Sequence, residues 1–106
     1  QQFVHIGEHA FIAGGSLVRK NVPPYVKAAR EPLSYVGVNS VGLRRRGFSD
    51  QQIMNVEDIY RVVYVQNSNI TTALKVADIE LPSSEEKDAI LDFIRGSTKG
   101  IMRGLS

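Results

Sequence analysis

The sequence contains no cysteine, and this single absence removes several kinds of chemistry. Disulfides, thiolate nucleophiles and cysteine-based zinc sites are all excluded. The chain also lacks any run of about 18 apolar residues, so we expect no membrane-spanning helix. Its first residues do not show the basic segment followed by an apolar segment that marks a signal peptide. We therefore expect a cytoplasmic protein.

Histidine is scarce, and the common motifs of catalysis are missing. The two histidines, His5 and His9, have no carboxylate at a spacing that requires a catalytic dyad. No zinc-binding helix, phosphate-binding loop or nucleophile elbow is present. We therefore expect no catalytic residue, no metal site and no cofactor within these 106 residues.

The net charge is only +2, but it is spread unevenly. Residues 1–46 carry seven lysines and arginines against two acidic residues, whereas residues 47–106 carry six against nine. This asymmetry favours an anionic ligand near the first half of the chain. The excess is too small to indicate DNA binding, and no stacking aromatic residues alternate with the basic ones. We therefore expect no nucleic-acid partner.

Residues 6–23 repeat in steps of six. Each group of six begins with a branched apolar residue and has a small or branched residue in its fifth place. The first places are Ile6, Ile12 and Val18, and the fifth places are Ala10, Ser16 and Val22. This pattern is typical of a hexapeptide-repeat parallel β-helix, in which three hexads form one triangular coil. The alternative is a chance repeat in an ordinary three-stranded sheet.

A single coil is not expected to be stable alone, because each repeat buries its apolar side only against neighbouring repeats. We therefore expect earlier coils before residue 1, so that the chain is the C-terminal part of a longer protein. The segment Val22-Pro-Pro-Tyr-Val26 contains two prolines and predicts an extended edge or exit segment. Residues 27–32 are expected to form an exposed connection, and residues 33–36 a short strand that returns toward the coil.

The second half of the chain follows the three-and-four spacing of helices. A first helix of about two turns fits between Asn39 and Arg46. Ser49 and Gln52 predict a capping box that opens a second helix, which runs to Gln66.

Two more helices are expected after a break at residues 67–69. The third begins at Asn69 or Thr71 and continues through Ala77, and a capping box of Ser83 and Glu86 opens the fourth. The side chains expected in the helical core are Ile53, Val56, Ile59, Tyr60, Val63, Ala73, Leu74, Ala77, Ile90, Leu91, Phe93 and Ile94.

The predicted fold class is therefore mixed, with β structure followed by α structure. Residues 1–36 form the last coil of a parallel β-helix and its exit segment. Residues 37–106 form a small all-α domain, closed by a loose turn from residue 97 onward.

Three consecutive arginines, Arg44 to Arg46, close the first helix before Gly47. Successive residues of a helix are rotated by about 100°, so at most two of these side chains point at a common ligand. Their planar guanidinium groups favour a phosphate or carboxylate partner. The alternative is a solvated basic turn at the negative end of the helix dipole.

Several segments together resemble one enzyme family, the acyl-[acyl-carrier-protein]–UDP-N-acetylglucosamine O-acyltransferases. The segments are Gln2-Phe3, the coil Ile6 to Val22, Val22-Pro-Pro-Tyr-Val26, Gly37-Val-Asn39, Gly42-Leu43, Arg45-Arg-Gly-Phe48, and Ser97-Thr98 with Gly100. The resemblance covers essentially the whole chain. The proline segment and the arginine segment are specific, whereas many unrelated transferases share the hexads.

This resemblance implies a left-handed β-helix followed by a helical C-terminal domain, assembled as a homotrimer. It implies transfer of a 3-hydroxyacyl chain from acyl carrier protein to the 3-hydroxyl of UDP-N-acetylglucosamine, the first step of lipid A biosynthesis. The family's catalytic histidine lies on an earlier coil, outside these residues. The chain alone is therefore expected to be inactive.

The resemblance also assigns ligand contacts to residues of this chain. Asn39, Arg45 and Arg46 match positions that hold the nucleotide and its phosphates. Gln2 matches a position that lines the substrate site. Gly14 matches the position that limits acyl-chain length, and glycine there is similar to the long-chain form because a larger side chain would shorten the groove.

Two positions depart from the family pattern. Gln1 stands where relatives often have histidine. Val41 stands where some relatives have a glutamate that contacts the nucleotide, and valine cannot accept a proton from a ribose hydroxyl. An acidic carrier protein would be attracted by the basic first half together with four basic residues of the helices. These four are Lys75, Arg95, Lys99 and Arg103.

Two alternatives stay open. One is the sister N-acyltransferase of the same pathway, which is also a hexapeptide trimer; the Arg45-Arg-Gly-Phe48 segment favours the O-acyltransferase. The other is a non-enzymatic module that binds a carrier protein or promotes trimerisation, which would be stable without earlier coils.

Overall fold

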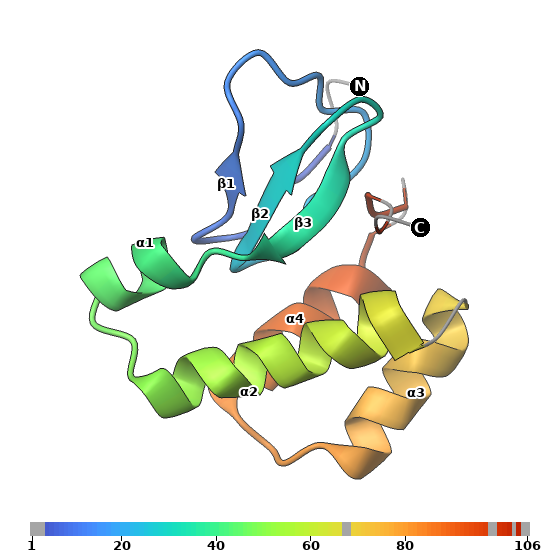
Figure 1. Cartoon of the computed structure of the whole chain (residues 1–106). Coiled ribbons are helices and arrows are strands. Elements are labelled where there is room, and N and C mark those ends of the chain that lie inside the picture. The colour runs from blue at the N-terminus through green and yellow to red at the C-terminus, as the bar shows by residue number, and fades with distance from the viewer. Residues whose placement is uncertain (1–3, 67–68, 98–99, 103, 105–106) are drawn as a thin grey trace.

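The computed structural model describes residues 4–66, 69–97, 100–102 and 104. A short three-stranded sheet comes first in the chain and helices follow (Figure 1). The strands are β1 (Phe11–Ile12), β2 (Val26–Ala29) and β3 (Ser34–Val38), adjacent in that order. β1 pairs with β2 in parallel, and β2 pairs with β3 antiparallel. The mixed fold class, β followed by α, is confirmed at this level.

The parallel pairing shows how the chain returns alongside itself. Phe11 pairs with Lys27, and an isolated parallel bridge joins Ile6 to Val22, so paired residues are 16 positions apart. Three full hexads would place them about 18 apart. The stretch between paired residues is therefore two residues shorter than the predicted three-hexad coil. The shortened stretch contains a tight turn at Gly15, which has a φ of 82°.

The proline segment is buried, which corrects its prediction as an edge. Residues 21–26 are all buried, and Gly7 donates its backbone N–H to the Val22 carbonyl at 2.7 Å. A Cβ on Gly7 would lie 2.4 Å from the Pro24 nitrogen, so only glycine permits this approach. Residues 27–29 are likewise not an exposed connection, because they belong to the central strand β2. Lys27 points outward from that strand while Ala28 is buried, as the alternation of a strand requires.

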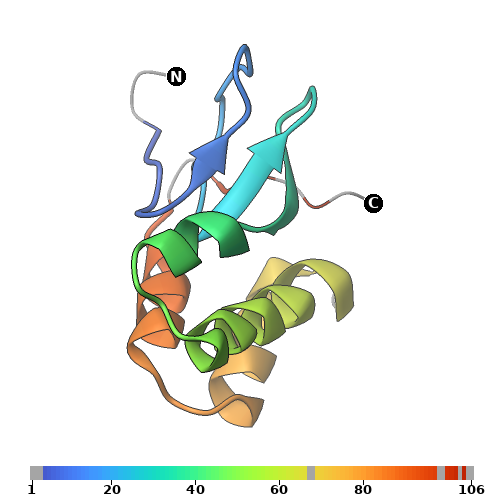
Figure 2. The same cartoon turned by 60° about the vertical axis from the view of Figure 1, so that its left-hand side comes forward.

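The helices form a second layer below the sheet (Figures 1 and 2). They are α1 (Ser40–Arg45), α2 (Asp50–Tyr60), α3 (Ile70–Glu80) and α4 (Glu85–Arg95), and α2 continues as a π-helical stretch, η1 (Arg61–Gln66). The described residues contain no helix long and apolar enough to cross a membrane.

Most predicted helix starts are confirmed. Asn39 caps α1, and Ser49 forms the predicted capping box with Gln52 at the start of α2. Asn69, one of the two candidates, caps α3, which continues three residues beyond Ala77.

The predicted start of α4 is wrong by one residue. Ser84, not Ser83, accepts the hydrogen bond from the Lys87 backbone N–H, so no capping box with Glu86 forms. The side chain of Glu86 instead accepts a hydrogen bond from Gln52 Nε2 at 3.3 Å.

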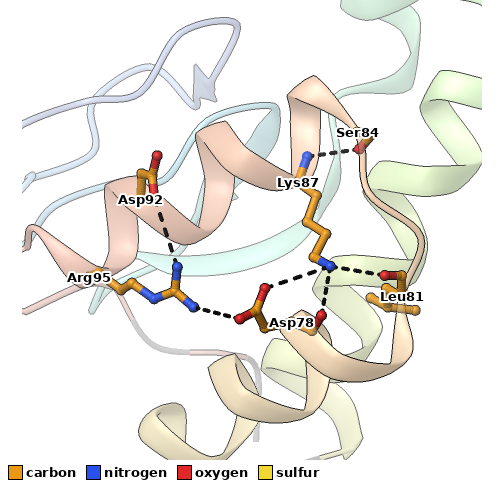
Figure 3. A network of polar contacts seen from close by, with 6 residues as sticks. All are labelled: Asp78, Leu81, Ser84, Lys87, Asp92 and Arg95. Carbon is orange, nitrogen blue, oxygen red and sulfur yellow. Dashed lines mark hydrogen bonds and ion pairs between the residues drawn. The ribbon is translucent and has the colours of Figure 1, made fainter.

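The reason lies in the neighbouring helix (Figure 3). Lys87 Nζ donates to the carbonyls of Asp78 and Leu81, both at 2.9 Å, and thus caps the C-terminal end of α3. Asp78 is also 3.5 Å from Arg95 of α4. A cation at a helix C-terminus is favoured by the helix dipole, so this network joins α3 to α4.

The core is continuous from the sheet to the helices. One cluster of buried residues includes Val22, Val26 and Val38 together with Ile53, Ile59 and Ile90. Phe93 is only partly buried, which corrects its place in the predicted core list. The boundary predicted between residues 36 and 37 falls inside β3 and stays a prediction.

Residues 100–102, the part of the tail after Ser97 that forms pairing contacts, lie beside Asn21, which the predicted loose turn did not include. Asn21 pairs with Ile101 in a parallel bridge, and the Met102 N–H donates to the Asn21 carbonyl at 2.9 Å. The Tyr64 hydroxyl donates to the Met102 carbonyl at 2.8 Å. Residues 101 and 102 therefore lie between Asn21 and Tyr64.

Candidate functional site

The three arginines at the C-terminal end of α1, of which Arg46 is the C-cap, separate into one that forms an ion pair and two that form none with the described residues. Arg44 forms an ion pair with Asp50 at 3.3 Å. Arg45 and Arg46 are exposed, and neither forms an ion pair with any residue that the structure describes. Two adjacent, uncompensated guanidinium groups can bind an anion with two charged oxygens, such as a diphosphate. These are the two arginines that the sequence analysis assigned to phosphate.

The side-chain amide of Asn39 forms hydrogen bonds to two other residues of this chain. Its Oδ1 accepts the Gly42 N–H at 3.3 Å, which caps α1, and its Nδ2 donates to the His9 carbonyl at 3.0 Å. Both ends of the amide are therefore engaged, whereas the sequence analysis expected Asn39 to contact a nucleotide directly. The second hydrogen of Nδ2 is the group still able to reach a ligand.

An aromatic cluster lies beside α1. The ring centroids of His9 and Tyr25 are 5.9 Å apart and stacked, and Phe48 meets His9 edge-on at 5.2 Å. The Tyr25 hydroxyl donates to Glu8 at 3.4 Å. Burial, aided by the Glu8 charge, raises the pKa of Tyr25 to about 12, so its hydroxyl stays protonated at neutral pH.

Gly14 lies at an open surface. It is exposed, and a Cβ built on it would meet no heavy atom within 4 Å. It lines a hollow of about 380 Å³ together with Gly15 and Arg30. A larger side chain would therefore fit within this chain, and it would affect only what occupies the space outside.

The remaining predicted contacts are partly outside the described residues. Gln1, Gln2, Lys99 and Arg103 lie there. Val41 is 61% exposed on α1, so its apolar side chain faces away from the core. Lys75 is exposed. Arg95 forms ion pairs with Asp78 and Asp92, and these carboxylates partly neutralise the positive field of its guanidinium group.

The family assignment rests on a match over most of the chain. A sequence profile described as UDP N-acetylglucosamine O-acyltransferase, domain 2, matches residues 21–102. This span includes the proline segment, the arginine helix and all later helices. The chain belongs to the UDP-N-acetylglucosamine O-acyltransferase family. The sequence-based resemblance is thereby confirmed.

Individual members of this acyltransferase family are similar along nearly the whole chain. The acyl-[acyl-carrier-protein]–UDP-N-acetylglucosamine O-acyltransferase of Myxococcus xanthus is 37% identical over 102 residues, which are 96% of this chain and 40% of that protein. The crystal structure of the UDP-N-acetylglucosamine acyltransferase from Bacteroides fragilis matches with a TM-score of 0.94 and 45% identity over 97% of this chain and 40% of that one. The structure of the Francisella novicida UDP-N-acetylglucosamine acyltransferase matches with a TM-score of 0.84 and 31% identity, over 95% of this chain and 37% of that one.

The chain thus spans about 40% of the length of the UDP-N-acetylglucosamine acyltransferases that it matches. Sequence reasoning missed the grouping of His9, which precedes the family match, with Tyr25 and Phe48 inside it. His9 was considered only as a catalytic candidate. The sequence offers no local signal for this grouping, because the left-handed φ of 60° at His9 and its contact with Phe48 are visible only in the structure.

Proposed function

We propose that the protein containing this chain transfers a 3-hydroxyacyl group from acyl carrier protein to the 3-hydroxyl of UDP-N-acetylglucosamine, the first step of lipid A biosynthesis. The observation that carries this proposal is the pair of uncompensated arginines, Arg45 and Arg46, on a helix inside the family match. Asn39 and Gln2 would complete the contacts to the UDP-sugar. The catalytic histidine would lie outside these residues, so the chain alone would be inactive.

The proposal includes an assembly. Residues 1–36 would be the last coil of a left-handed β-helix and its exit, and residues 37–106 its helical domain. Parallel pairing of β1 with β2, and of Ile6 with Val22, supports a solenoid coil. Ile6, Phe11 and Leu17 are each more than half exposed, which suits a surface that packs against other coils or copies. Three copies would form a cytoplasmic homotrimer.

An acceptor assay with the whole protein tests the reaction. Incubated with a 3-hydroxyacyl carrier protein, it is expected to acylate UDP-N-acetylglucosamine and not the acylated UDP-glucosamine that is the acceptor of the N-acyltransferase. The opposite preference would favour the sister enzyme. Transfer to neither acceptor, with retained carrier binding, would favour the non-enzymatic module.

A larger residue at Gly14 is expected to shorten the acyl chain that the enzyme prefers. We expect Gly14→Met to lower kcat/KM for a long-chain donor by about 10- to 200-fold, the discrimination that an apolar pocket achieves against one methylene too many. A donor with a short acyl chain is the internal control and should react at the normal rate. Equal losses with both donors would mean that Gly14 does not limit chain length.

The acidic carrier protein is expected to associate faster at low salt. Lys20, Lys27 and Lys75 are exposed and form no ion pair with the described residues, so they would contribute to its landing surface. Because the Debye length shrinks from about 30 Å at 0.01 M salt to about 8 Å at 0.15 M, steering by exposed charges weakens over this range. The apparent second-order rate constant with acyl carrier protein should fall as salt is raised. A constant rate across this range would count against electrostatic docking.

A further inference from the structure

Helix α1 is too short to hold its own position. It has six residues, and Leu43 is its one buried side chain. Helices below about 12 residues are marginal in water without tertiary contacts. The direction in which Arg45 and Arg46 project therefore depends on what holds the two ends of the helix.

His9 contacts the residues that hold each end of α1, Asn39 before the helix and Phe48 after it. At the N-terminal end, the His9 carbonyl accepts the hydrogen bond from Asn39 Nδ2 at 3.0 Å, and Asn39 caps the helix. At the C-terminal end, Phe48 donates its N–H to the Leu43 carbonyl at 3.0 Å and packs edge-on against the His9 ring at 5.2 Å. The helix is thus held between the backbone and the side chain of His9.

His9 is itself held in place from the coil. Its ring stacks on Tyr25, which is buried, with an angle of 14° between the planes. The Tyr25 N–H donates to the Glu8 carbonyl at 3.0 Å, and the Tyr25 carbonyl accepts the Asn39 N–H at 2.8 Å. The backbone of His9 has a φ of 60°, which directs its carbonyl toward α1 while its ring faces Phe48.

We propose that His9 is a positioning residue that fixes α1 at both ends and so aims Arg45 and Arg46 at the diphosphate of the nucleotide. This inference rests on the proposed function of these two arginines. His9 itself would not contact the nucleotide. Its effect is on binding of the UDP-sugar and not on the chemical step.

The test uses the whole enzyme and steady-state kinetics with UDP-N-acetylglucosamine. His9→Asn keeps a residue that tolerates a left-handed φ but removes the ring. We expect KM for the UDP-sugar to rise about two- to tenfold, the worth of the lost ring contacts, with kcat changed less than twofold. Phe48→Leu removes the partner ring at similar volume and should act alike. Tyr35→Leu, which breaks a different aromatic stack, is the matched control and should leave KM unchanged.

Combination with Arg46→Ala separates the explanations. If His9 acts through Arg45 and Arg46, His9→Asn should raise KM less in the Arg46→Ala background than in the wild type, and little further once Arg45→Ala is added. Independent, multiplying effects would mean that His9 contacts the ligand or acts elsewhere, and would overturn the proposal. An unchanged KM in both ring variants would overturn it as well. If Arg46→Ala itself leaves KM unchanged, the proposed nucleotide site is wrong. If Arg46→Ala raises KM but His9→Asn and Phe48→Leu do not, the nucleotide site stands and only the proposed role of His9 is wrong.

Discussion

Tyr60→Ala is expected to lower the free energy of unfolding by about 3–5 kcal/mol, the cost of deleting a large buried aromatic side chain. Tyr60 is completely buried near the end of α2. Its ring stacks with Tyr35 at 5.5 Å and with Tyr64 at 5.9 Å, and its hydroxyl donates to the Pro24 carbonyl at 2.6 Å. This one side chain therefore joins the helices to the buried proline segment. Denaturant unfolding of the whole protein, with amide exchange of α2 as a local probe, measures the loss.

Tyr60→Phe separates packing from hydrogen bonding. It keeps the ring and leaves the Pro24 carbonyl without its donor, so we expect a smaller loss of about 1–3 kcal/mol. Burial raises the pKa of Tyr60 well above its ordinary value, so its hydroxyl is a permanent donor near neutral pH. Tyr35→Phe is the matched control, because the Tyr35 hydroxyl makes no hydrogen bond within the described part of the chain. Equal losses in Tyr60→Phe and Tyr35→Phe would contradict a special role for the bond to Pro24.

Features that depend on near neighbours in the sequence could be predicted. The caps at Asn39 and Ser49 join groups three residues apart, so their residue types alone indicate the geometry. The same rule failed at Ser83 and Ser84, two adjacent serines with equal capping ability. Ser84 is the serine that accepts the Lys87 backbone N–H, and the Lys87 side chain donates to carbonyls at the end of α3. A contact between helices is not visible in a local pattern.

Prediction of the candidate site was limited in the same way, because local sequence patterns do not reveal contacts between distant residues. The sequence pattern and the family resemblance identified Arg45 and Arg46, and the pairing of Arg44 with Asp50 spans only six residues. The contact between Asn39 and His9 spans 30 residues, so no local pattern could join them. The repeat predicted that the chain returns parallel to itself, but it did not predict the 16-residue spacing of that return, because the turn at Gly15 and the close approach of Gly7 to Pro24 depend on how the chain packs on itself.

Arg46→Ala is expected to weaken binding of UDP-N-acetylglucosamine by about 1.5–3 kcal/mol, the worth of a hydrogen bond between charged groups. This corresponds to a dissociation constant about 10- to 150-fold higher. Arg46 is exposed and has no ion pair among the described residues, so its removal leaves no buried charge and should not destabilise the fold. Calorimetric titration of the whole enzyme with the UDP-sugar measures the change, and thermal unfolding of the variant checks that the fold is intact.

Two further variants decide whether geometry or charge alone is responsible. Arg46→Lys keeps the charge but loses the planar fork, so it should recover only part of the affinity if the arginine binds phosphate oxygens in a bidentate way. Arg44→Ala removes a charge two residues before Arg46, but the Arg44 guanidinium is already paired with Asp50. Because its guanidinium is turned toward Asp50, Arg44→Ala should change binding little, and because exposed ion pairs contribute only about 0–1 kcal/mol to stability, it should also leave the fold intact. If Arg44→Ala weakened binding as much as Arg46→Ala, the arginines would act as a diffuse basic patch, and the two-fork site proposed for the diphosphate would be wrong.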